Sequence, residues 1–197
     1  MAVRGREIAE TELTLYFDDF RAAIAAGTAH FWTTYEADAH RITTVCRANM
    51  IRCFIADELK KRLDGKSEIK IIEDQQTTAI CFGHNWLLKV HKFDEECHAA
   101  INRTQTCLDL NDNDLCDVKL PGIPDDATVV FLGYIEIIGD RLHPEMRLSC
   151  PDGTKPAWII DLNEAPELPI VEIIGDADQQ GGTKVVVKPD KAKKSSQ

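Results

Sequence analysis

The densest group of reactive side chains lies between Phe82 and His98. Side chains alternate along a strand, so if residues 86–91 form one, Lys89 and His91 share a face. Histidine exchanges protons near neutral pH and lysine supplies positive charge, which together suit a phosphate or nucleotide pocket. The candidate catalytic residues are His84, Lys89, His91 and Lys92. The interpretation that the pattern favours is simpler, because polar alternation alone produces the solvated face of a half-buried strand.

Side chains that can ligate metals occur at close spacing in the same stretch, at His91, Asp94, Cys97 and His98. On a helix, Asp94 would neighbour Cys97 or His98. Acidic residues also complement the dipole at a helix start, and this interpretation is favoured. The seven cysteines include no close Cys-x-x-Cys pair. The acidic run from Asp109 lacks the glycine and glutamate of a calcium loop. The sequence therefore predicts no metal site and no cofactor.

Helical periodicity precedes these residues in the chain. Apolar side chains recur at three- and four-residue intervals at Leu13, Phe17, Phe20 and Ile24. This spacing predicts a helix over 7–31, with an interruption at Gly27-Thr28. Thr33-Thr-Tyr-Glu36 fits a capping box, so a second helix is expected to begin there and to end near Asp64. Aromatic and acidic side chains of the first helix offer a partner-binding surface or belong to the core. They are Tyr16, Asp18, Asp19, Phe31, Trp32 and Tyr35.

After Lys66 the apolar residues follow the two-residue period of strands. Strands are expected at 68–72, 77–82, 86–91, 127–138, 146–149 and 157–162, with a short helix within 94–110 and a hairpin turn at 151–153. The fold class predicted is α+β, with two N-terminal helices packed on a mainly antiparallel β-sheet. One domain is expected over 1–175, helical at 7–64 and β-rich at 66–175, and residues 171–174 are interpreted as an edge strand. Residues 176–197 are expected to form a flexible, lysine-bearing tail.

Composition excludes several classes of function. The chain of 197 residues has a formal net charge of −10, which disfavours general DNA binding, because that affinity depends on neutralising phosphates. No stretch approaches the roughly 20 apolar residues that span a bilayer, and the first residues contain no apolar signal segment. These features predict a cytoplasmic protein without a membrane anchor, with its cysteines reduced.

Four segments carry a resemblance to a known group of proteins. They are Leu120-Pro-Gly-Ile-Pro, Val130-Phe-Leu-Gly-Tyr-Ile, Leu148-Ser-Cys-Pro-Asp-Gly and Ala157-Trp-Ile-Ile-Asp-Leu. Over residues 86–162 the chain resembles uncharacterised bacterial proteins encoded beside regulators that join a helix-turn-helix to an ImmA/IrrE-like metallopeptidase domain. The shared motifs are structural, so the resemblance implies a context and not a set of catalytic residues.

That resemblance implies a component of a bacterial toxin–antitoxin or phage-defence module that acts through complex formation with the neighbouring regulator. Two alternatives stay open at this point. One is an enzyme that acts on RNA or nucleotides through the His/Lys pocket, and the other is a structural or regulatory binding module.

Overall fold

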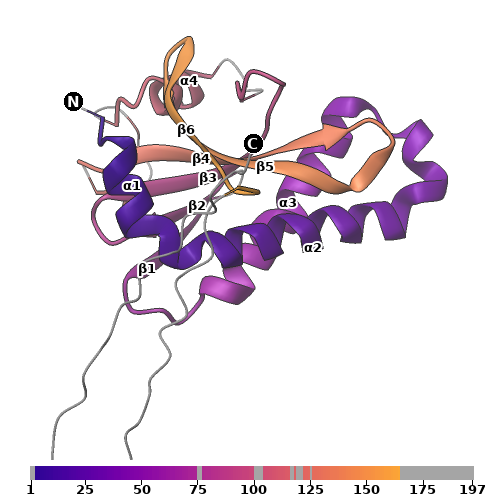
Figure 1. The fold of residues 1–197 in the computed structure, drawn as a ribbon, viewed down its shortest axis with the longest axis horizontal. Helices are drawn as coiled ribbons and strands as arrows, with labels where there is room; N and C mark the ends of the chain where they lie inside the picture. The colour runs from indigo at the N-terminus through magenta and orange to yellow at the C-terminus, as the bar shows by residue number, and fades with distance from the viewer. Residues whose placement is uncertain are drawn as a thin grey trace, which may run out of the picture. The chain divides into compact units, whose positions relative to one another are not determined.

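The computed structural model describes residues 3–74, 77–99, 104–115, 118, 122–124 and 126–164 (Figure 1). The predicted strand at 171–174 and the predicted tail at 176–197 lie outside the described residues. The helices are α1 (Arg6–Leu13), α2 (Phe17–Tyr35), α3 (Thr44–Leu63) and α4 (Gln105–Asn111), with 3₁₀ turns η1 (Thr14–Tyr16) and η2 (Glu36–Arg41). The strands are β1 (Ile69–Asp74), β2 (Thr77–Phe82), β3 (Trp86–Lys92), β4 (Thr128–Ile137), β5 (Asp140–Asp152) and β6 (Lys155–Asp161).

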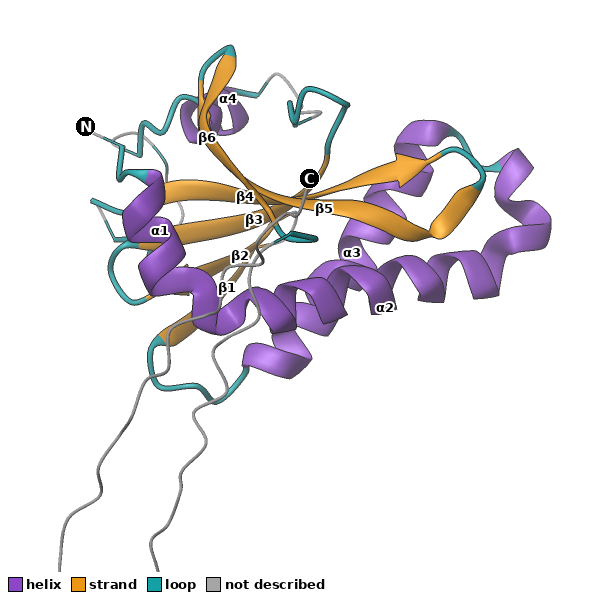
Figure 2. Ribbon diagram, viewed as in Figure 1, coloured by secondary structure: helices purple, strands orange, loops and turns teal. Residues whose placement is uncertain are grey.

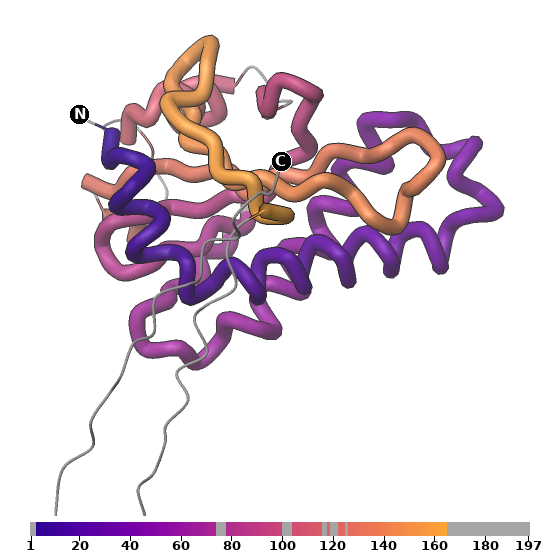
Figure 3. The backbone as a smooth tube through the Cα atoms, in the orientation of Figure 1, coloured from indigo at the N-terminus to yellow at the C-terminus, as the bar shows by residue number. Residues whose placement is uncertain are grey.

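The six strands form one sheet in the order β1-β2-β3-β4-β5-β6. Every neighbouring pair is antiparallel except β3 and β4, which are parallel. The α+β class and the mainly antiparallel sheet are therefore confirmed. A parallel pair needs a long crossover connection, and residues 93–127, which include α4, supply it. Figure 3 shows the described parts of this connection, α4 included, on the side of the sheet away from α2.

Side-chain alternation divides the sheet between two cores. Leu88 and Leu132 belong to the larger core, which they share with residues of α2 and α3. Leu87 and Val129 point the other way and pack with Leu110 of α4. The central strands β3 and β4 are consequently buried on both faces, and β4 is almost continuously apolar, whereas β3 also contains Lys89, His91 and Lys92.

The helices differ from the prediction at three points. The 3₁₀ turn η1 divides the expected first helix into α1 and α2, and α2 continues through Gly27 without an interruption. The capping box at 33–36 was wrong, because Thr33 lies inside α2, where its hydroxyl donates to the Ala29 carbonyl at 2.8 Å. The second long helix is instead capped by Thr43, whose hydroxyl accepts from the Cys46 amide at 3.3 Å.

Gly27 has a packing role in place of the expected helix-breaking role. A Cβ atom at this position would lie 2.6 Å from the Ile55 backbone nitrogen, closer than real Cβ contacts allow. Only a residue without a side chain lets α2 and α3 approach so closely, and these two helices form the layer that covers the sheet (Figure 2). Gly27 therefore lies at the point where α2 and α3 cross, although glycine is less favourable than alanine within a helix.

Strand lengths also differ from the prediction. The expected strand at 146–149 is the middle of the much longer β5, and the expected turn at Pro151-Asp152-Gly153 does join β5 to β6. The short helix within 94–110 is present only at its end, as α4. Earlier in that stretch, Ala99 forms a bridge with Phe93.

Candidate partner-binding site

The structure places the four candidate catalytic residues in three different surroundings. His84 is exposed in the turn between β2 and β3. Lys89 and His91 do share one face of β3, on the side of α4, and they are 8% and 7% exposed. Lys92 lies at the end of β3 on the opposite face, where its ammonium pairs with Glu136. The solvated-face interpretation is wrong for Lys89 and His91, and the catalytic role of all four residues stays a prediction.

The face that carries Lys89 is apolar. Its cross-strand neighbour is Phe131, and the His91 ring lies 4.3 Å from the Phe131 ring, centroid to centroid. Burial lowers the pKa of the Lys89 ammonium below its ordinary value, because removal from water penalises the charged form. The protonated lysine thus costs the folded state free energy.

Replacing Lys89 with methionine should stabilise the protein by about 1 kcal/mol at neutral pH, because the apolar stem is kept and the buried charge is removed. The unfolded chain, with the higher lysine pKa, binds the proton more tightly, so native stability rises as the pH climbs between the two pKa values. The gain from the variant should therefore shrink at alkaline pH. Urea titrations at several pH values measure both effects. Lys155→Met, at an exposed lysine, is the control and should change little. Destabilisation by Lys89→Met would contradict the cost assigned to the charge.

The candidate metal ligands do not assemble into a site. The His98 Nδ1 atom lies 3.4 Å from an Asp94 carboxylate oxygen, while Cys97 is buried in the smaller core. Among the residues that the structure describes, no group of three or more His, Cys, Asp or Glu side chains could hold a metal ion. Asp94 has a structural role instead, because its carboxylate accepts from the Glu96 and His98 amides at 3.0 and 2.8 Å.

This turn ends β3 and, among the residues that the structure describes, leaves part of the next strand without a neighbour. Pairing of β3 with β4 stops at Tyr134, whose carbonyl accepts from the Phe93 amide at 3.0 Å. Pairing of β4 with β5 continues to Ile137. Residues 135–145 therefore form a two-stranded hairpin beyond the end of β3, which we call the arm. Figure 2 shows it extending along α2 and α3.

A cleft of about 1020 Å³ lies between the arm, the turn after β3 and the helices. Its charged lining consists of Asp94, Glu95, Glu96, Glu136, Glu145, Arg47, Lys92 and Arg141. Glu136 is central, because its carboxylate pairs with Lys92 and lies 3.6 Å from the Arg47 Nε atom. Five carboxylates against three cations give the cleft an acidic excess.

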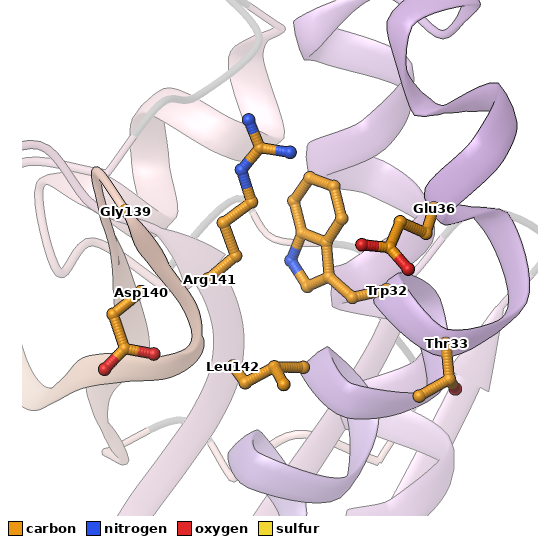
Figure 4. A pocket seen from close by; sticks show the side chains of 7 residues that line it. All are labelled: Trp32, Thr33, Glu36, Gly139, Asp140, Arg141 and Leu142. Atoms are coloured by element: carbon orange, nitrogen blue, oxygen red, sulfur yellow. The ribbon is translucent and has the colours of Figure 1, made fainter.

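Trp32 of α2 lies where the arm meets the helices. The guanidinium groups of Arg47 and Arg141 stand 5.6 and 4.6 Å from the centre of its ring, a cation–π arrangement. The indole nitrogen is buried and has no hydrogen-bond partner in the described part of the chain. Figure 4 shows Arg141 and Leu142 of the arm facing Trp32 across a smaller hollow of about 460 Å³. Of the aromatic residues predicted as surface or core, Phe31 and Trp32 belong to the core, and Tyr16 and Tyr35 pack against it.

The arm carries exposed apolar side chains that the sequence analysis did not single out. Ile138 at its tip is fully exposed, and Ile137 and Leu142 are 37% and 47% exposed. The available signal was the pair of isoleucines directly before the Gly139-Asp140 turn, where polar residues are the norm. An exposed apolar hairpin tip beside two arginines has the composition of a protein-binding surface.

Fold and cleft together define a helix-covered, mainly antiparallel α+β protein with a projecting hairpin and an acidic cleft at its base. Searches against family models, curated proteins and solved structures found no match for the chain. Within the described residues, no helix has both the length and the apolarity needed to cross a membrane.

Proposed function

We propose that this protein is the binding component of a bacterial toxin–antitoxin or phage-defence module and acts by forming a complex with the neighbouring regulator protein. The observation that carries the binding role is the arm, which extends past the end of β3 and exposes Ile137, Ile138 and Leu142. Covering these side chains would remove apolar surface from water, which favours association.

The surroundings of the arm support the same role. Arg47 and Arg141 lie at its base, next to the buried ring of Trp32, and arginine is among the residue types enriched at the energetic centres of interfaces. The resemblance of residues 86–162 to proteins encoded beside helix-turn-helix/metallopeptidase regulators supports that regulator as the partner.

Replacing Ile138 with aspartate should weaken the complex with the adjacent-gene regulator by at least about ten-fold, because a carboxylate would have to be desolvated in the interface. The measurement is co-expression of the two proteins, followed by calorimetric titration of the purified pair. Ile138 makes no core contacts, so the variant should fold normally.

Leu15→Asp is the matched control, since Leu15 is 66% exposed on η1, away from the arm. It should bind as the native chain does. If Ile138→Asp binds equally well, the arm is not the contact surface. If the native protein forms no complex with the regulator, the proposed function is overturned.

A further inference from the structure

Beyond Tyr134, the edge of β4 that faced β3 has no partner strand among the described residues, and this edge lies along the cleft. Tyr134 is the last residue of β4 paired with β3, and its carbonyl bonds to Phe93 on that edge. Because backbone groups alternate in direction along a strand, those of Glu136 point to the same edge. Ile135 pairs with Glu145 and Ile137 pairs with Asp140, so only Glu136 separates the two pairs on β4. The extra residues of this irregularity therefore lie on β5.

The cleft lies where β3 would have continued. Asp94 to Glu96 close one end of it, at the point where the chain turns away from the sheet. The rest of the lining comes from both faces of β4, with Trp32 and Arg47 on the helix side and Ile135 on the other. Because residues on both faces of β4 line the cleft, the cleft runs along the edge of this strand. An extended chain can therefore lie in the cleft beside β4.

Charge indicates what kind of chain would fit. Glu136 lies between two cations, Lys92 and Arg47, and Glu145 pairs with Arg147, so the acidic excess lies in the turn at 94–96. Glu95, in contrast, forms no ion pair with any residue that the structure describes. An incoming segment with basic side chains would balance the acidic excess, and its apolar side chains could cover Ile137 and Ile138.

We propose that the cleft binds an extended, basic segment of the partner protein, which adds as a strand to the free edge of β4. The inference rests on the proposed function and specifies how the partner is held. In strand addition, main-chain hydrogen bonds provide affinity and alternate side chains provide selectivity. An unpaired edge beside exposed isoleucines is otherwise a hazard for aggregation, which a bound strand removes.

The test uses the full chain and a short fluorescent peptide of alternating lysine and valine, with binding followed by anisotropy. Methylating every second peptide nitrogen keeps the charge and removes the donors, and should weaken binding at least about ten-fold. The double variant Glu95→Gln/Glu96→Gln should weaken it several-fold, whereas Glu7→Gln, an exposed acid on α1, should not. Equal binding of the methylated peptide, or no binding of the lysine–valine peptide, would overturn strand addition.

The two proposals fail differently. If the regulator complex is sensitive to Ile138→Asp but the peptide does not bind, the binding function stands and strand addition does not. The remaining measurement is the oligomeric state of the native chain, determined by analytical sedimentation. A dimer that Ile138→Asp dissociates would mean that a second copy occupies the edge, and would also overturn the inference.

Discussion

Replacing Gly27 with valine should lower the free energy of unfolding by about 3 kcal/mol. A Cβ atom would stand 2.6 Å from the Ile55 nitrogen, and a backbone atom cannot move aside as the end of a flexible side chain can. The two long helices would have to separate, and Phe20, Ile24 and Ile51 would lose contacts in the larger core. The improved helix propensity of valine offsets only a small part of this loss.

Guanidinium denaturation followed by far-ultraviolet circular dichroism measures the effect. Gly5→Val is the matched control, because a Cβ at Gly5 meets nothing within 4 Å, and it should cost only a few tenths of a kcal/mol as a changed helix cap. A Gly27→Val protein as stable as the native chain would refute the close crossing of α2 and α3.

Replacing Asn113 with alanine should cost about 3 kcal/mol, for a reason that lies in the strand ladder. Pro151 has no amide hydrogen and follows a register shift in β5, so pairing of β4 with β5 ends at Phe131 and Ser149. The buried Asn113 amide fills the gap, since its oxygen accepts from the Val129 nitrogen at 2.6 Å and its nitrogen donates to the Pro151 carbonyl. Alanine leaves both backbone groups buried without these bonds.

Asn113 also has a backbone φ of 52°, in the left-handed region that asparagine tolerates better than alanine does. Asn113→Gly separates the two contributions, because glycine adopts this conformation freely but provides no amide. Thermal unfolding should show the glycine variant nearly as unstable as the alanine variant. If glycine restores native stability, the side-chain bonds are not what holds this part of the sheet.

Local periodicity was sufficient to predict the fold class. The alternating residues of β1 to β3 and the Pro151-Asp152-Gly153 turn lie where the pattern indicated. Local sequence signals gave wrong helix boundaries where packing against a distant segment determines the structure. The capping box at Thr33 is a valid helix start in isolation, but burial of Phe31 and Trp32 against the core continues α2 past it. Gly27 resembles a helix-breaking residue in the sequence, and its packing role is evident only from the position of Ile55 in the structure.

The candidate site shows the same division. Strand alternation correctly placed Lys89 and His91 on one face of β3, but their burial depends on Phe131 and on the connection that contains α4, far along the chain. The expected strand at 127–138 was already longer than the one at 86–91, but periodicity did not show that the two pair. It also gave only the middle of β5, so the hairpin beyond the end of β3 was not predicted.

The single parallel pair determines the order in which the sheet can assemble. The strands β1 to β3 follow one another closely in the chain, as do β4 to β6, so each trio can form through contacts between residues close in sequence. Pairing β3 with β4 instead requires residues 93–127 to close as a loop, which costs conformational entropy before any contact repays it. We therefore expect the slow step of folding to be the joining of two three-stranded halves along β3 and β4.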